Sequence, residues 1–388
     1  MTTTTTIPNV AAKGKNPLQG LLAHGQSPWI DYIRRDLLTG GGLRSMMEQD
    51  GLRGMTSNPT IFEKAITGSK LYADILESPE AKSLDPKSVY EKIAIRDVQD
   101  AADLFRPVYQ ETNRRDGYVS LEVSPLLAHD TRGTIEEARR LWKAVGRPNV
   151  MIKVPGTQEG LPAIRQLLEE GLNINITLLF AQSVYEQVAD IYFEALEVRV
   201  KKGQDISHTA SVASFFVSRI DTLIDTLIDH KLESVTDRSP RELLTGLQGK
   251  VAIANARLTY RKYLELVATD RWKALASKGA GTQRLLWAST STKNPKYRDV
   301  LYVEELIGAD TVDTMPPATF DAFRDHGRLR ASLTEDVQGA AQVMATLAKA
   351  GISMLEVTDK LVVDGVKLFA DAFNQLLEAT GSTARASA

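Results

Sequence analysis

The chain contains 388 residues, of which 43% are apolar and 25% are charged, enough for one large core or two of medium size. Its net charge of -2, with both signs mixed, predicts neither a nucleic-acid partner nor an anionic membrane surface, and no apolar run reaches the ~18 residues of a membrane span. Zero cysteines exclude disulfides and thiolate chemistry and favour a cytoplasmic location, and five scattered histidines predict no metal site. The triple glycine at 40–42 lacks the pattern of a P-loop or a dinucleotide site, so no other cofactor is expected.

The two ends of the chain differ in composition from the rest. Residues 1–24 begin with a threonine-rich run and lack the apolar segment of a secretory signal, which predicts a flexible leader. Residues 25–380 contain no linker rich in proline, glycine or serine, so we expect a single catalytic domain there, as a monomer or a homodimer. Residues 381–388 are predicted to be a disordered tail.

Polar side chains share one face of each of the first two predicted strands. Residues 29–33 are predicted as a strand on which Asp31 lies on the same face as its apolar neighbours two positions away. A helix is predicted over 42–49. Residues 54–59 are predicted as the next strand, with Asn58 on its polar face.

The third predicted strand, residues 118–125, alternates between apolar and polar side chains and places Glu122 on its polar face. Such alternation usually means that one face of the sheet meets water. In a parallel sheet whose outer face is covered by helices, the polar face must point instead to a shared interior. A closed barrel supplies such an interior.

The fourth predicted strand, residues 149–155, is apolar except for one charged residue, Lys153. A lysine on such a strand can block aggregation at a sheet edge, or it can extend its amine to the surface. It can also be a desolvated amine that serves covalent chemistry. The polar faces of the neighbouring strands favour this last interpretation.

Four more strands are predicted, over 173–180, 206–216, 284–290 and 310–315, with helical segments between them. A capping-box pattern at 239–242 predicts that one of these helices starts there. Eight strands that alternate with helices predict an α/β fold, a (β/α)8 TIM barrel. Because a plain barrel takes about 250 residues, we expect extra helices at the N-terminus, after the second and sixth strands and at the C-terminus.

The inward-facing residues of such a barrel suit Schiff-base catalysis. A neutral amine attacks a ketone, and the resulting imine accepts electrons from an adjacent C–C bond, so that no metal is needed. Lys153 is the candidate nucleophile, and Asp31 is the candidate for moving the proton of a sugar hydroxyl. Glu122 and Thr177 are candidates for holding a water molecule that shuttles protons.

Five short motifs, in order and spacing, resemble those of the transaldolases. They are TSNPT at 56–60, SLEVS at 120–124, MIKVP at 151–155, NITLLF at 175–180 and SFFVSR at 214–219. The resemblance extends from about Gln26 to Glu378, and the segment SPWIDYIRRD at 27–36 is similar to the long, bacterial type.

The resemblance implies sugar-phosphate substrates and transfer of a dihydroxyacetone unit from sedoheptulose 7-phosphate to glyceraldehyde 3-phosphate. It implies Lys153 as the Schiff-base lysine, Asp31 as the acid and base at the cleaved bond, and Glu122 with Thr177 at the catalytic water. The residues that it implies for binding the dihydroxyacetone unit are Asn58, Asn175 and Ser214, and those for binding the phosphate are Arg219 and Ser289.

One departure from the short form of the family affects the phosphate site. An arginine is usual two residues after the seventh-strand serine, whereas this chain has Ser291. Lys293 is the candidate that supplies the missing charge, and the alternative is that it is a solvated loop lysine. A lysine is a point charge and lacks the planar fork of an arginine, so the phosphate geometry is expected to differ.

Other functions remain open from the sequence. A fructose 6-phosphate aldolase on the same barrel would release free dihydroxyacetone, but such enzymes tend to carry tyrosine where this chain has Phe216. A metal-dependent aldolase is disfavoured by the few histidines. A catalytically dead barrel that only binds sugar phosphates would show binding without turnover.

Overall fold

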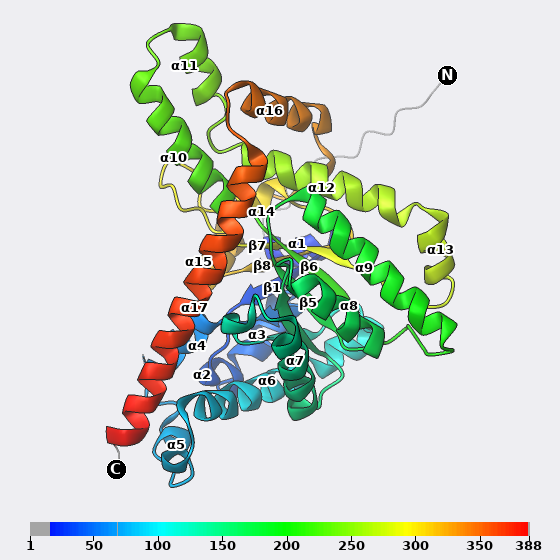
Figure 1. The fold of residues 1–388 in the computed structure, drawn as a ribbon, viewed down its shortest axis with the longest axis vertical. Helices are drawn as coiled ribbons and strands as arrows, with labels where there is room; N and C mark the ends of the chain where they lie inside the picture. The colour runs from blue at the N-terminus through cyan, green and yellow to red at the C-terminus, as the bar shows by residue number, and fades with distance from the viewer. Residues whose placement is uncertain (1–15, 68, 387–388) are drawn as a thin grey trace.

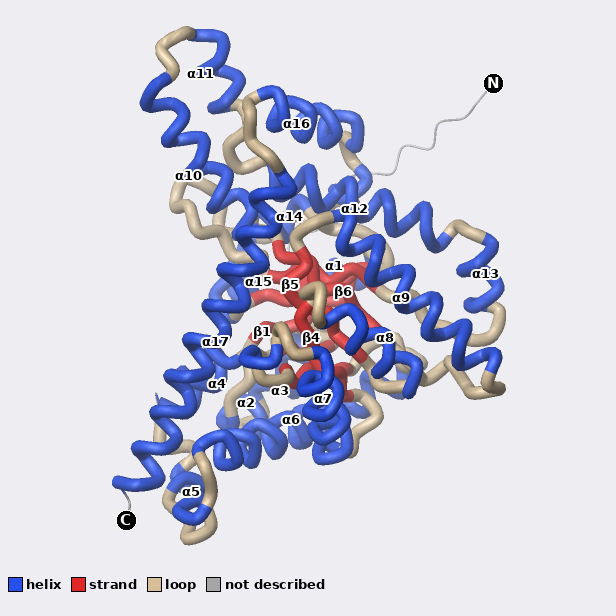
Figure 2. The backbone as a smooth tube through the Cα atoms, viewed as in Figure 1, coloured by secondary structure: helices blue, strands red, loops and turns tan. Residues whose placement is uncertain are grey.

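The computed structural model describes residues 16–67 and 69–386, and within them eight parallel strands close into a barrel in sequence order. Figure 2 shows the strands at the centre of the molecule with helices around them. The predicted (β/α)8 TIM-barrel class is therefore confirmed. The strands are β1 Gln26–Asp31, β2 Gly54–Thr56, β3 Tyr118–Glu122, β4 Val150–Pro155, β5 Ile174–Leu179, β6 Ser211–Phe216, β7 Arg284–Ala288 and β8 Thr311–Met315.

Helices connect the strands, and the extra helices lie at the places expected from the sequence. Those inserted between β2 and β3 are α4 Pro59–Thr67, α5 Ala73–Leu76, η1 Ala81–Ser83 and α6 Pro86–Glu111, and those between β6 and β7 are α10 Ser218–Ser234, α11 Arg238–Thr245, α12 Val251–Val267 and α13 Asp270–Ala276. The other connections contain α2 Arg35–Thr39, α3 Gly42–Gln49, η2 Pro125–Leu127, α7 Thr131–Val145, α8 Gly160–Glu170, α9 Gln182–Lys201 and α14 Leu301–Glu305.

Local signals explain several of the helix ends. Asp85 caps α6 by accepting a hydrogen bond from the Ser88 amide, and Gly171 ends α8 in the left-handed conformation predicted for a C-cap. A helix does begin at the predicted place, but no capping box forms there. Helix α11 begins at Arg238, one residue before the serine of the motif, and its N-cap is Asp237, whose side chain makes no capping hydrogen bond.

The first strand starts earlier than its apolar residues predict. It begins at Gln26, whose side-chain amide donates to the Leu306 carbonyl at 2.6 Å, and Ser27 donates to Asp116 at 2.8 Å. These polar residues are buried at the N-terminal end of the barrel, where hydrogen bonds replace water. The apolar residues alone predict that the first strand starts at residue 29, and the structure corrects this start to Gln26.

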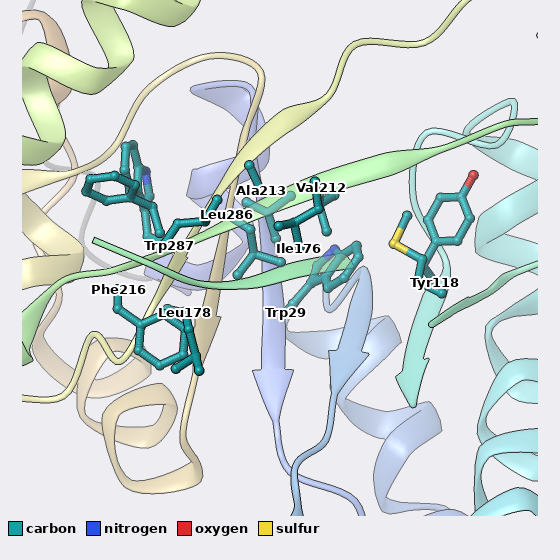
Figure 3. Close-up of a cluster of buried hydrophobic side chains, with 14 of the residues drawn as sticks. Trp29, Tyr118, Ile176, Leu178, Val212, Ala213, Phe216, Leu286 and Trp287 are labelled. Carbon is teal, nitrogen blue, oxygen red and sulfur yellow. The ribbon is translucent and has the colours of Figure 1, made fainter. Parts of the chain in front are cut away.

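An ion pair closes the same end of the barrel. Arg284 of β7 and Asp116 are both almost fully buried, and their side chains lie 2.9 Å apart. Asp116 also accepts a hydrogen bond from the Trp29 indole at 3.2 Å. Figure 3 shows Trp29 in one buried apolar cluster with Ile176 and Leu286. The buried ion pair and the Trp29 indole therefore occupy the interior at this end of the barrel.

The segments at the two ends of the chain contain more structure than expected. Helix α1, Pro17–Ala23, buries Leu18 and Leu21, so the part of the predicted leader from residue 16 onward is structured, while residues 1–15 lie outside the described part. The C-terminal helices are α15 Pro317–His326, η3 Ser332–Thr334, α16 Val337–Lys349 and α17 Met354–Ala386. Helix α17 continues into the predicted tail as far as Ala386.

Helix α17 is the long red helix that runs along the barrel in Figure 1, and it packs against α4, α6 and α10. One side of this helix buries aromatic residues and the other exposes charged residues, as expected for an amphipathic helix that packs on a barrel. No helix in the described ranges is both long enough and apolar enough to cross a membrane.

Candidate active site

A cavity of about 490 Å³ opens at the C-terminal ends of the strands. This is the end of a TIM barrel where catalytic residues meet, and the volume lies within the range of small-molecule sites. The residues of the predicted site that line it are Asp31, Asn58, Lys153, Thr177, Ser214, Phe216, Arg219, Ser289 and Lys293. Glu122 and Asn175 are not among its lining residues and lie in the surrounding layer.

Lys153 points into the barrel from β4 and is only 5% exposed. Its amine donates to the Glu122 carboxylate at 3.1 Å and to the backbone carbonyl of Ser57 at 3.0 Å. The pairing of β3 with β4 places Glu122 directly opposite Lys153, so the strand register itself sets this contact. The lysine is therefore neither a sheet-edge charge nor a solvated one.

Asp31 ends β1 at the wall of the same cavity. The Thr56 hydroxyl donates to one carboxylate oxygen at 2.6 Å and lies 2.8 Å from the Thr314 hydroxyl. The Asn58 amide lies 3.5 Å from the other carboxylate oxygen, and its own side-chain oxygen caps α4 through the Ile61 amide. Neighbouring strands β1, β2 and β8 thus jointly orient one carboxylate.

Burial governs the electrostatics of both acids. It raises the pKa of Asp31 above the ordinary range, although the charge of Lys153 and the Thr56 hydrogen bond act in the opposite direction. Burial also raises the pKa of Glu122, and the adjacent Lys153 again opposes the shift. A raised pKa favours acids that can both take up and return a proton near neutral pH.

The polar residues of β5 and β6 form a second group. Ser214 donates to the Asn175 side-chain oxygen at 2.6 Å, and the Asn175 amide donates to Ser120 at 3.0 Å. Both polar groups of the Asn175 side chain therefore form hydrogen bonds inside the barrel wall. Asn175 thereby orients Ser214, which faces the cavity. Thr177 also lines the cavity, and its buried hydroxyl has no hydrogen-bond partner among the described residues.

Positive charge gathers at the side of the cavity formed by β6 and β7. The Arg219 guanidinium packs on the Phe216 ring, with its central carbon 5.5 Å from the ring centroid. The Lys293 amine also faces the cavity and donates to the Ser291 hydroxyl at 2.7 Å. Burial, followed by repulsion from Arg219, lowers the pKa of Lys293, and an anion between the two cations would relieve that repulsion.

Ser289 belongs to the same group and has an unusual backbone. Its φ of +56° lies in the left-handed region, which few residues other than glycine adopt. Its hydroxyl lies 3.0 Å from that of Ser218, at the start of α10. Backbone strain of this kind is concentrated at binding sites.

The family model described as "Transaldolase/Fructose-6-phosphate aldolase" matches residues 28–380. A protein of Trichodesmium erythraeum named "Transaldolase" is 48% identical over 91% of this chain and 93% of its own length. A "Transaldolase 2" of a Nostoc species is 47% identical over 93% of this chain and 96% of its own length, and a "Transaldolase" of Frankia alni is 45% identical over 93% and 96%.

The chain belongs to the transaldolase/fructose-6-phosphate aldolase family. Membership of this family makes it an enzyme and agrees with the resemblance that five motifs indicate. The identity extends over nearly the whole of each relative, so the helices around the barrel are included.

Some residues around this family site were not predicted. Thr314 of β8 lines the cavity, but it shares its strand face with the apolar Val312, so no polar alternation marks it. Lys64 on α4 and Phe369 on α17 also line the cavity. No strand pattern marks these two, because helices bring them to the cavity from distant parts of the chain.

Proposed function

We propose that the chain transfers a dihydroxyacetone unit from sedoheptulose 7-phosphate to glyceraldehyde 3-phosphate through a Schiff base on Lys153, giving erythrose 4-phosphate and fructose 6-phosphate. Membership of the family and relatives named transaldolase at 43–48% identity support transaldolase activity. The observation that carries the proposed mechanism is a buried amine 3.1 Å from a carboxylate, in a cavity that a second carboxylate also lines.

Imine formation needs an amine without its extra proton. Glu122 is within hydrogen-bond distance of Lys153, and burial raises the pKa of Glu122, so it is placed to take that proton. The free amine then adds to the ketone carbon of the donor sugar, and the ketone oxygen leaves as water after protonation. The unpartnered hydroxyl of Thr177 is available to the water molecules of this step.

Bond cleavage is assigned to Asp31. Its carboxylate takes the proton of the hydroxyl on the fourth carbon, that carbon becomes an aldehyde, and the C3–C4 electron pair moves into the iminium to form a neutral enamine. The enamine then attacks the carbonyl carbon of the acceptor, whose oxygen takes the proton back from Asp31. Hydrolysis of the new iminium by one water molecule frees the product and Lys153.

The remaining residues are assigned to substrate binding. Asn58 and Ser214 face the cavity near Lys153 and suit the hydroxyls of the three-carbon unit, while Asn175 holds Ser214 in place. Arg219, Lys293 and Ser289 offer two cations and a hydroxyl to the phosphate. In this assignment Lys293 replaces the arginine of the short form.

Borohydride reduction in the presence of fructose 6-phosphate tests the nucleophile. We expect a three-carbon adduct on the peptide that contains Lys153, detected by mass spectrometry, and loss of the adduct in Lys153→Ala. Lys64→Ala is the matched control because Lys64 lines the same cavity, and it should still be trapped on Lys153. An adduct on another lysine, or none in the wild type, would contradict the mechanism.

The same protein distinguishes the transferase from an aldolase. We expect turnover of fructose 6-phosphate to depend on an added acceptor aldehyde, because the enamine has no other efficient outlet. Equal turnover without an acceptor, with release of free dihydroxyacetone, would favour the aldolase of the same family.

A further inference from the structure

Helix α17 brings an aromatic ring to the active site. Phe369 is buried at 5% exposure and lines the cavity beside Leu368. Its ring centroid lies 5.9 Å from the Lys153 amine and 5.8 Å from the central carbon of the Arg219 guanidinium. One ring therefore contacts both the proposed nucleophile and the proposed phosphate ligand.

A close approach of α17 to the strand ends makes this position possible. Gly365 lies one turn before Phe369, and a Cβ atom there would meet the Leu178 side chain at 2.8 Å. Leu178 itself has a φ of +60°, at the register shift between β5 and β6. Helix α17 and the irregular end of β5 therefore pack closely against each other next to the cavity.

Arg219 lies between two aromatic rings. The Phe216 and Phe369 centroids are 5.5 Å and 5.8 Å from its guanidinium carbon. Within the described residues Arg219 forms no salt bridge with a carboxylate, so its hydrogen-bond donors are free for an anion while the rings limit its movement.

We propose that Phe369 is a positioning residue that closes the active site over Lys153, keeps bulk water from the enamine and fixes Arg219 against Phe216. This inference rests on the proposed function. Water exclusion matters because the nucleophilic carbon of the enamine has two possible reactions. It can form a C–C bond with the acceptor, or it can take a proton from water.

The second reaction ends in release. Protonation of that carbon gives an iminium, and hydrolysis by one water molecule yields free dihydroxyacetone and the lysine amine. Phe369 takes no part in bond making or proton transfer. Its ring, whose centroid lies 5.9 Å from the Lys153 amine, occupies space beside that amine that water would otherwise fill. Phe369 therefore biases the enzyme toward transfer.

The test compares Phe369→Ala with Leu376→Ala, a fully buried residue two turns further along α17 that does not line the cavity. The measured quantity is the rate of acceptor-independent dihydroxyacetone release from fructose 6-phosphate divided by the rate of transfer. We expect Phe369→Ala to raise this ratio roughly three- to tenfold. Leu376→Ala should lower the melting temperature but leave the ratio at the wild-type value.

A second measurement addresses Arg219. The preference of kcat/KM for fructose 6-phosphate over fructose, which lacks the phosphate, should fall in Phe369→Ala and not in Leu376→Ala. If Phe369→Ala does not fold, Phe369→Leu replaces it, and a smaller rise of at least about twofold in the release ratio is expected. The inference is overturned if both quantities are unchanged, or if Leu376→Ala changes them equally.

Failure of the proposed function gives a different result. If the wild type forms no adduct on Lys153 and shows no transfer, the mechanism itself is wrong, whatever the variants do. If the wild type transfers and Phe369→Ala transfers with the same ratio and the same phosphate preference, only the role of Phe369 is wrong.

Discussion

Two threonine hydroxyls determine the environment of Asp31. Thr314 lies 2.8 Å from Thr56, and Thr56 donates to Asp31 at 2.6 Å. With the Thr56 proton directed to Asp31, the bond between the two threonines must be donated by Thr314. This arrangement stabilises the ionised carboxylate and partly offsets the burial that raises the pKa of Asp31.

Thr56→Val should therefore move the acidic limb of the kcat/KM profile for donor cleavage to higher pH. The ionised form of Asp31 is the active base, and loss of the Thr56 hydrogen bond, which lowers the pKa of Asp31, raises that pKa further. Thr259→Val is the control, because Thr259 is also buried and hydrogen-bonded but lies on α12. An unchanged limb, or one that moves to lower pH, would remove Asp31 from this role.

At the scale of elements, β1 and β2 pair through a residue that has no side chain. Trp29 lies opposite Gly54 in the register, and a Cβ atom on Gly54 would come within 2.4 Å of the indole ring. The indole also donates to Asp116, so it cannot turn away without losing that hydrogen bond. A glycine is required here by space, since its φ is not in the left-handed region.

Gly54→Ala should lower the free energy of unfolding by about 1–3 kcal/mol, because the ring or the strand must shift. Gly281→Ala is the matched control, since a Cβ atom there meets nothing within 4 Å, and its effect should stay within about 0.5 kcal/mol. Urea midpoints of the two variants measure the difference. Equal midpoints would mean that the barrel adjusts freely at this pair.

At the scale of the whole molecule, the two ends of the barrel have separate tasks. One end is filled by the buried pair of Arg284 and Asp116, whose side chains are 4% and 6% exposed. The other end contains the cavity with Lys153 and Asp31. In TIM barrels the first of these ends contributes stability and the second contributes chemistry.

Asp116→Asn should accordingly lower the free energy of unfolding by about 3–5 kcal/mol, because it leaves the buried Arg284 charge without its partner. The value of kcat/KM for the folded enzyme should change little. Asp103→Asn is the control: Asp103 pairs with Arg147 at 2.6 Å at the surface, where such pairs contribute about 0–1 kcal/mol. A large loss of activity at unchanged stability in Asp116→Asn would contradict this division.

The sequence by itself determined the barrel class, the order of the strands and the inward direction of Lys153, Glu122 and Asp31. These features follow from side-chain alternation along single strands and from the regular spacing of strands and helices, which are local properties. Helix ends with a marked residue, such as Gly171, were also predicted. The start of α11 was placed slightly too late, because its N-cap Asp237 forms no side-chain capping hydrogen bond and Ser239, which was expected to be the cap, lies inside the helix.

Only the tertiary structure decided which residues meet across distant segments. It placed Glu122 within 3.1 Å of Lys153, moved Asn175 behind Ser214 and brought Phe369 from the C-terminal helix onto the cavity. It also replaced the expected leader, from residue 16 onward, with a packed helix. Such contacts depend on strand register and helix packing between residues that can lie more than two hundred positions apart, and no pattern within one segment contains that information.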